Sequence, residues 1–175
     1  MNRYIVMIFA AALVFGCCLQ AQTTNPLTTE AKRAFDNVSN NLLRAADKMP
    51  EENYTFKPVP EIRSWGELMA HTADSAASYC GRAKGEQKSV GAASKKTKAE
   101  IVAALKEALD YCDTVYDSLT DATVVQMIQG RGGQNSRLSV LNGNLSHMNE
   151  EYGYAAVYLR LKGIVPPSSD RSAGR

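Results

Sequence analysis

The stretch TKAEIVAALKEALDYCDTVYDSL, residues 97–119, shows most directly how this chain folds. Its apolar residues recur at steps of three and four, which places them on one face of a helix. They are Ile101, Leu105, Ala108, Cys112, Val115 and Leu119. Thr97 and Glu100 form the pattern of a capping box, in which both side chains satisfy free backbone N–H groups at a helix start. The stretch therefore predicts an amphipathic helix with a defined beginning.

Three further stretches carry the same kinds of signal. Apolar steps of three and four predict a helix from about residue 29 to 49, which a proline ends. Ser64 and Glu67 form a second capping box, and the helix that they open is expected to cover about 64–82. The fourth helix is expected over about 136–162, where a glycine and two prolines follow it.

Four amphipathic helices of similar length predict an all-α, up-down four-helix bundle. No segment alternates apolar and polar residues over the length of a strand, so we expect no sheet. The segment 121–135 is expected to be a flexible connection, because its glycines lack the strand and the Lys-Ser/Thr ending of a phosphate-binding loop. The lysines between residues 84 and 98 lie in a Gly/Ser/Ala-rich stretch, which indicates a solvated loop.

The first residues have the composition of an export signal. Arg3 is the only charged residue among residues 1–29, and an apolar run covers 5–19. The run is shorter than the ~20 residues that span a bilayer. We therefore predict a signal peptide over residues 1–21, a mature domain over 22–175, and a periplasmic or extracellular protein.

A second route of export stays open. Residues 14–17 resemble a bacterial lipoprotein signal, which would attach lipid to Cys17 and hold the protein at a membrane. Phe15 stands where such signals usually carry a small residue, which favours simple secretion.

Removal of the leader leaves 19 Lys and Arg residues against 18 Asp and Glu residues. Nucleic-acid-binding proteins carry a clear basic face, so this near-neutral balance gives no reason to expect nucleic acid as a partner. Cys80 and Cys112 are the only cysteines of the mature chain. Both fall on predicted core faces and export permits oxidation, so we expect a disulfide between the second and third helices. Two buried free thiols are the alternative.

The chain has two histidines, His71 in the second predicted helix and His147 in the fourth. Histidine is the commonest metal ligand. Glu151 follows His147 by four residues, so their Cβ atoms should lie ~5–6 Å apart on one helix face. This spacing suits a divalent metal site, although spacing alone favours a surface His–Glu pair. Asp74, three residues after His71, could orient the His71 ring or be an exposed helix charge.

Longer stretches resemble the DinB-like (DNA-damage-inducible) family. SWGELMAHTAD at 64–74 is similar to the second helix of that family, LSHMNEEYG at 145–153 to the fourth, and YTFKP at 54–58 to the segment that leads into the second helix. The resemblance covers nearly all of the mature chain in the expected order. It implies a bundle of the DinB-like type, and it leaves a homodimer open because members are often dimeric.

The same resemblance implies a metal site. Many members of the family hold zinc or nickel with three histidines, one from the second helix and two from the fourth, four residues apart. The matching positions here are His71, His147 and Glu151, so that a carboxylate replaces one histidine. Two histidines and a glutamate are a known catalytic zinc set that leaves one position open for water. We therefore expect these three residues to bind a divalent ion, zinc or nickel, between neighbouring second and fourth helices.

Some relatives are thiol S-transferases and others isomerise small acids. The resemblance thus implies a metal-dependent hydrolase or transferase that acts on a small molecule. Two alternatives stay open: a non-catalytic bundle that binds metal or ligand, and a structural bundle with a decayed site. Glu150 and Tyr154 are the candidates for a proton-handling group, and the sequence assigns no catalytic residue.

Overall fold

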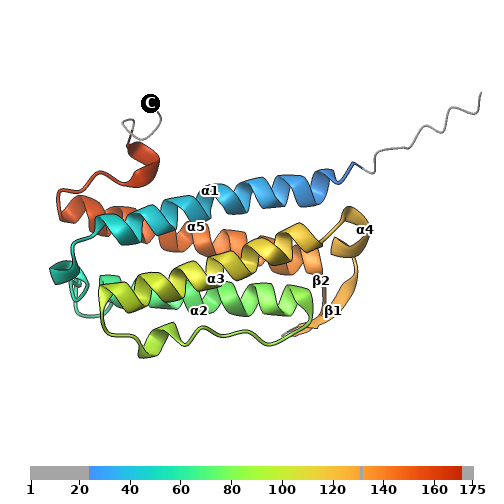
Figure 1. The fold of residues 1–175 in the computed structure, drawn as a ribbon, viewed down its shortest axis with the longest axis horizontal. Coiled ribbons are helices and arrows are strands. Elements are labelled where there is room, and N and C mark those ends of the chain that lie inside the picture. Colours follow the sequence, from blue (N-terminus) through green and yellow to red (C-terminus); the bar gives the residue numbers. More distant parts are fainter. Residues whose placement is uncertain (1–23, 131, 171–175) are drawn as a thin grey trace, which may run out of the picture.

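Four long helices make up the body of the protein in a computed structural model that describes residues 24–130 and 132–170. They are α1 (Pro26–Lys48), α2 (Trp65–Lys84), α3 (Lys98–Ser118) and α5 (Arg137–Leu161). Figure 1 shows them packed along the long axis of the molecule. The prediction of an all-α four-helix bundle is confirmed, and each helix ends within a few residues of its predicted bounds. The predicted signal peptide and Cys17 lie outside the described residues.

The helix ends follow the local sequence. The Ser64 hydroxyl accepts the Glu67 N–H, and the Glu67 carboxylate accepts the Ser64 N–H at 2.6 Å, so the predicted capping box starts α2. Thr97 and Glu100 make the same pair of bonds at the start of α3. Gly85 stops α2 with a φ of 94°, a left-handed conformation that glycine adopts without steric cost.

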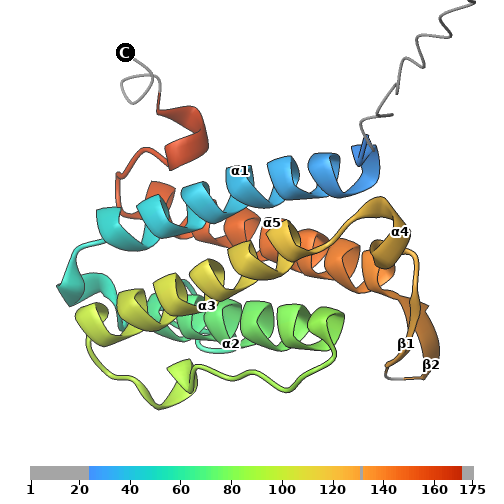
Figure 2. The ribbon, with the colours of Figure 1, turned by 45° about the vertical axis from the view of Figure 1, so that its right-hand side comes forward.

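The helices are arranged so that α2 packs between α3 and α5, while α1 contacts the same two helices from the opposite side. Figures 1 and 2 show that α2 and α3 run in the same direction, and that α1 and α5 run in the other. The connection 85–97, which contains the short helix η2 (Ala92–Ser94), therefore returns along the whole bundle. The expected up-down alternation was thus wrong between α2 and α3, because this connection is long enough to bring the chain back to the end at which α2 starts. This order makes α2 and α5 direct neighbours, as the expected metal site requires.

The segment between α3 and α5 differs from its prediction. It contains α4 (Asp121–Val124) and an antiparallel hairpin of β1 (Met127–Gly130) and β2 (Gly133–Ser136). The expectation of no sheet was therefore wrong here, and the segment expected to be a flexible connection contains a short helix and a hairpin. The strands are only four residues long and mostly polar, so the sequence has no alternating apolar pattern that would predict them. Asp121 further fixes the segment, because its carboxylate accepts the backbone N–H groups of Leu27 and Thr28.

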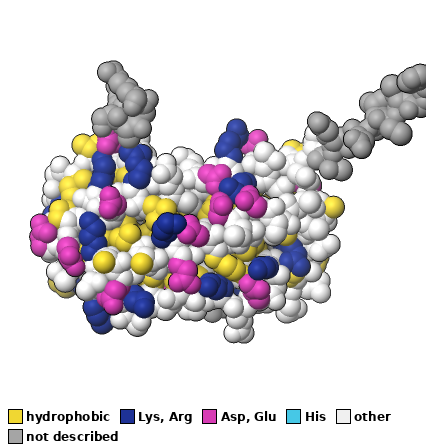
Figure 3. Space-filling model, viewed as in Figure 1, with side chains coloured by type: hydrophobic (Ala, Val, Ile, Leu, Met, Phe, Trp, Pro, Cys, Tyr) yellow, Lys and Arg dark blue, Asp and Glu magenta, His cyan; other side chains and the backbone are white. Residues whose placement is uncertain are grey.

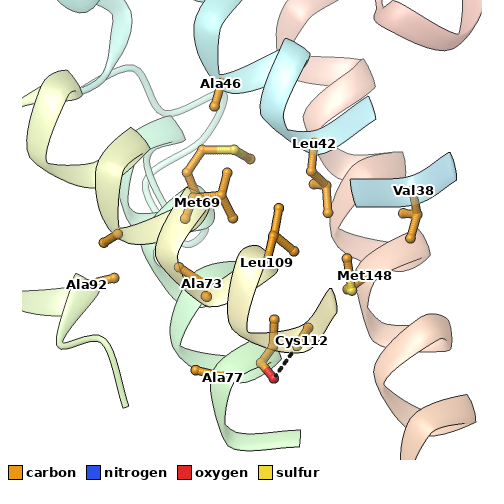
Figure 4. Close-up of a cluster of buried hydrophobic side chains, with 14 of the residues drawn as sticks. Val38, Leu42, Ala46, Met69, Ala73, Ala77, Ala92, Leu109, Cys112 and Met148 are labelled. Carbon is orange, nitrogen blue, oxygen red and sulfur yellow. Dashed lines mark hydrogen bonds between the residues drawn. The ribbon is translucent and has the colours of Figure 1, made fainter. Parts of the chain in front are cut away.

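The core fills the space between the four helices. Figure 4 shows Leu42, Met69, Leu109 and Met148, one from each long helix, directed into this interior, and each is at most 3% exposed. Five of the buried residues of α2 are alanines, whose small side chains allow α3 to approach closely. Trp65, fully buried at the start of α2, closes one end of the core.

The predicted disulfide is present in this core. Cys80 and Cys112 are bonded, their Cα atoms lie 5.3 Å apart, and both residues are fully buried. Because α2 and α3 are parallel, these cysteines lie at the same depth of the bundle, about four turns from the two helix starts. The bond links the two helices across the long connection 85–97.

The surface carries charges of both signs. Figure 3 shows Lys and Arg side chains interspersed with Asp and Glu side chains across the face formed by α1 and α3. Lys32 joins these helices there, with ion pairs to Asp36 at 2.7 Å and to Asp113 at 2.8 Å. Within the described residues, none of the helices is both long and apolar enough to span a membrane.

Candidate metal site

Three predicted ligands meet between α2 and α5. His71 comes from the second turn of α2, whereas His147 and Glu151 lie on one face of α5. The imidazole centroids are 5.0 Å apart and the rings are nearly perpendicular. Oε1 of Glu151 lies 3.5 Å from Nε2 of His71 and 3.6 Å from Nδ1 of His147. One potential ligand atom from each residue lies within 4.8 Å of the other two, so the structure brings together a group that could hold a metal ion.

The burial and hydrogen bonding of Glu151 show whether a cation would fit between these three side chains. The residue is 3% exposed, and its Oε2 atom has no hydrogen-bond partner among the described residues. Its distances to the two imidazoles are also longer than ordinary hydrogen bonds. A buried carboxylate without donors is unfavourable, and a cation removes that cost. Ligand atoms around one tetrahedral zinc ion lie roughly 3.3 Å apart, so the carboxylate–imidazole spacings fit with small side-chain movements.

The electrostatics favour the ligand forms of both histidines. Burial lowers the pKa of His71, and the positive charge of Arg63 lowers it further. Burial also lowers the pKa of His147, where Arg63 acts in the same direction and Glu150 opposes it. Both rings are therefore neutral at pH 7, and a neutral imidazole can donate a lone pair to a metal.

Glu151 is shifted in the opposite sense. Burial raises the pKa of its carboxyl group, and the nearby charge of Glu150 adds to the rise while Arg63 opposes it. The carboxylate form is thus disfavoured where no cation compensates its charge. A divalent ion between the three side chains would supply that compensation.

Asp74 has a different role from either of its predicted ones. Its two carboxylate oxygens accept the backbone N–H groups of Ala92 and Ala93, each at 3.0 Å. It therefore fastens the connection 85–97 to α2. The Lys-rich stretch is otherwise exposed or half-buried, as the expectation of a solvated loop requires, and Ala92 is its one buried residue.

Three further polar residues of α5, Glu150, Tyr154 and Tyr158, form hydrogen bonds to groups other than the three ligands. Tyr158 is buried, and its hydroxyl donates to the backbone carbonyl of Arg63 at 2.6 Å. Tyr154 is 51% exposed, and its hydroxyl donates to Glu150 at 3.0 Å. The candidates for a proton-handling group, Glu150 and Tyr154, thus pair with each other on the surface of α5.

A cavity of about 720 Å³ lies beside the three ligands, along the first half of α2. His71 lines it, and neither His147 nor Glu151 does. Arg63 lines it too, and sequence reasoning missed this residue. Its only sequence signal is its place directly before Ser64, the N-cap, which puts its side chain at the start of α2.

Comparison with known proteins agrees with this architecture. No curated protein sequence gives a significant match. The crystal structure of a DinB-like protein from Bacillus cereus ATCC 10987 has a similar fold, with a TM-score of 0.68 at 14% identity, over 79% of this chain and 95% of that chain. The sequence model of the DinB superfamily matches residues 34–155, which is more than half of the chain and includes all three candidate ligands. The chain therefore belongs to the DinB superfamily.

Proposed function

We propose that this protein binds a divalent metal ion, zinc or nickel, through His71, His147 and Glu151. The observation that carries the proposal is the buried Glu151 carboxylate, which lies between two neutral imidazoles and has an oxygen without a donor. Imidazole nitrogen with a carboxylate suits zinc and nickel, whereas calcium and magnesium prefer shells made of oxygen alone.

We further propose that the metal site serves a hydrolase or transferase that acts on a small molecule. A bound ion would act as a Lewis acid on a carbonyl or phosphoryl oxygen of the substrate. The protein itself would position the substrate. His71 belongs both to the ligand group and to the cavity wall, so a molecule in the cavity lies next to the metal site. The cavity volume of about 720 Å³ is within the range of small-molecule sites.

One observation favours a second candidate, a protein that binds metal or ligand without turnover. His147 and Glu151 do not line the cavity, so only one of the three ligands faces a molecule held there. The two candidates differ in a direct assay. Turnover of activated ester or thiol-conjugation substrates by the zinc-loaded protein, lost in His71→Ala, would identify the enzyme.

Metal analysis tests the site itself. The mature chain is purified without chelators or affinity tags that bind metal, and its metal content is measured by mass spectrometry. We expect close to one zinc or nickel ion per chain, and loss of that ion in His147→Ala. Tyr154→Phe is the matched control, because it changes an exposed residue of the same helix without removing a ligand. A metal-free protein that also fails to bind added zinc would refute the proposal.

We also propose that the protein is exported. The disulfide supports this location, since such bonds persist in oxidising compartments and are rare in the cytosol. Intact-mass measurement of the native protein in the envelope fraction tests it, with an expected start at Gln22. Added lipid mass on Cys17 would instead identify the anchored form, and a full-length cytoplasmic product would refute export.

A further inference from the structure

Arg63 is a positive charge without an ion-pair partner at the edge of the candidate metal site. Among residues 24–130 and 132–170, its guanidinium makes no hydrogen bond or ion pair with a side chain. Its backbone is nevertheless fixed, because the buried Tyr158 hydroxyl donates to its carbonyl. The capping box of the next residue, Ser64, also holds this part of the chain in place.

The charge of Arg63 acts directly on the site. It lowers the pKa of both His71 and His147 and opposes the rise in that of Glu151. Two neutral imidazoles, one carboxylate and a divalent ion would together carry a net charge of +1. The guanidinium next to them adds a further positive charge. Arg63 is exposed and lines the same cavity as His71, so two positive charges would face that cavity, and they favour an anion there.

The acidic residues of the cavity wall do not supply that anion. Both oxygens of Asp74 are taken up by the backbone N–H groups of Ala92 and Ala93. Glu67 accepts the Ser64 N–H and pairs with Lys57 at 3.2 Å. Glu61 is the remaining acidic residue of the wall, and it is exposed.

Most basic residues of the cavity wall have no ion-pair partner among the described residues. Lys95 and Lys96 also line the cavity, opposite the start of α2 on the connection 85–97. Neither ammonium group forms an ion pair within the described part of the chain. With Lys57 paired to Glu67, the wall has three further cations, Arg63, Lys95 and Lys96, against the two carboxylates of Glu61 and Asp74, which leaves a net positive charge. Arg63 and His71 line the same cavity.

We propose that the cavity binds a small molecule with a carboxylate or phosphate group, and that Arg63 holds this anionic group while the rest of the molecule lies against His71. Arginine suits this role because its planar guanidinium donates two parallel hydrogen bonds to either anion. The inference rests on the proposed function, since it identifies the substrate class of the metal site. Lys95 and Lys96 then contribute general attraction across the cavity.

Calorimetric titration of the zinc-loaded mature chain tests the inference with three probes. Succinate and glycerol 3-phosphate carry the two kinds of anion, and succinamide is a neutral molecule with the shape of succinate. We expect saturable binding of at least one anion and none of succinamide. Arg63→Met should weaken anion binding about 10- to 100-fold, as expected for the loss of charge-assisted hydrogen bonds. Arg63→Lys should keep part of the affinity, because it retains the charge and loses the paired geometry.

Arg33→Met is the matched control, because Arg33 is an exposed arginine of α1 and lines no part of this cavity. Its anion affinity should equal that of the unaltered protein. Binding that is unaffected by Arg63→Met, or equal binding of succinate and succinamide, would overturn the inference.

A separate zinc titration of each variant keeps the two proposals distinct. Normal zinc binding together with no dependence on Arg63 would refute the anion site and leave the metal site intact. Absence of zinc binding would refute the metal site, and the same anion titrations on the metal-free protein would then decide the role of Arg63 by the same criteria.

Discussion

The two sides of α2 are packed in opposite ways. Toward α3 the helix presents alanines and Cys80, and the contact is apolar and closed by the disulfide to Cys112. Toward α5 it presents His71, which meets His147 and Glu151. We refer to the contact of α2 with α3 as the α2–α3 seam and to its contact with α5 as the α2–α5 seam.

The α2–α3 seam contributes mainly to stability, whereas the α2–α5 seam contains the polar side chains of the candidate metal site. The α2–α5 seam contains two buried acceptors without partners in the described structure, Oε2 of Glu151 and Oδ1 of Asn144. Each such atom costs about 1–3 kcal/mol of stability. The alanines and cysteines of the α2–α3 seam contribute burial and a cross-link, and none of them has such an atom. A structural bundle would gain from apolar residues at both seams, so the retained polar group points to a function at the second.

Removal of the disulfide should have the largest effect. The bond closes a loop with a sequence separation of 32 residues, which corresponds to roughly 3–4 kcal/mol of stability in the chain-entropy model. We expect the Cys80→Ala/Cys112→Ala double variant to melt about 6–16 °C lower, a shift measurable by calorimetry.

The zinc affinity of the folded double variant tests whether the two seams are independent. It should stay within about twofold of the unaltered protein if they are. A larger loss would show coupling through Asn144, whose Nδ2 atom lies 3.6 Å from Sγ of Cys80. An unchanged melting temperature would contradict the stabilising role of the α2–α3 seam.

His147→Ala should remove the second-largest contribution, the stabilisation by metal. Zinc at 100 times its dissociation constant should stabilise the unaltered protein by about 2.7 kcal/mol, or about 5–11 °C in melting temperature. The variant should show no gain at the same zinc concentration, because a ligand is missing. Tyr154→Phe should keep the gain. Equal gains in His147→Ala and in the unaltered protein would place the ion elsewhere.

The sequence was enough to predict the α2–α3 seam. Helix periodicity places Cys112 on the core face of α3, the two capping boxes set both helix starts, and the pairing with Cys80 followed. Patterns of this kind can be found within the sequence of a single helix. The four-residue spacing of His147 and Glu151, which predicts that both lie on one face of α5, is another such pattern.

The rest depended on contacts between distant segments. No local pattern reveals that Asp74 binds the backbone of Ala92 and Ala93, or that Tyr158 holds Arg63 at the cavity edge. The hairpin of β1 and β2 was missed because its pairing is made by backbone groups of polar residues, which leave no apolar periodicity. The position of His71 beside α5 came from family resemblance, since spacing alone does not choose a neighbouring helix.

Glu151→Gln should have effects of opposite sign with and without metal. The folded state raises the pKa of Glu151, so the ionised carboxylate destabilises the metal-free protein above that pKa, and the penalty disappears as the pH falls toward the unfolded value. We expect metal-free Glu151→Gln to be more stable by about 1 kcal/mol at pH 7, with a difference that shrinks toward pH 5. With zinc the order should reverse, because a neutral amide is the weaker ligand.

Glu151→His sharpens this third prediction. It restores three imidazoles at the ligand positions and should bind zinc more tightly than the unaltered protein. Urea unfolding at pH 5 and 7, each with and without zinc, measures both effects in one design. A variant Glu151→Gln that is less stable without metal at pH 7 would contradict a strained, uncompensated carboxylate.

Asp74→Asn should have the smallest effect, and it separates a residue that fastens a loop from one that orients a ligand. The variant keeps one carbonyl oxygen for the Ala92 and Ala93 N–H groups and loses the charge, so we expect a loss of about 1 kcal/mol and faster hydrogen exchange at these two amides. The zinc affinity should stay within about twofold of that of the unaltered protein, because both carboxylate oxygens of Asp74 are bonded to the connection 85–97. A residue that oriented the His71 ring would instead cost 10- to 100-fold in metal affinity. A loss of that size, without faster exchange at the two amides, would return Asp74 to the metal site and extend the α2–α5 seam by one turn of the helix.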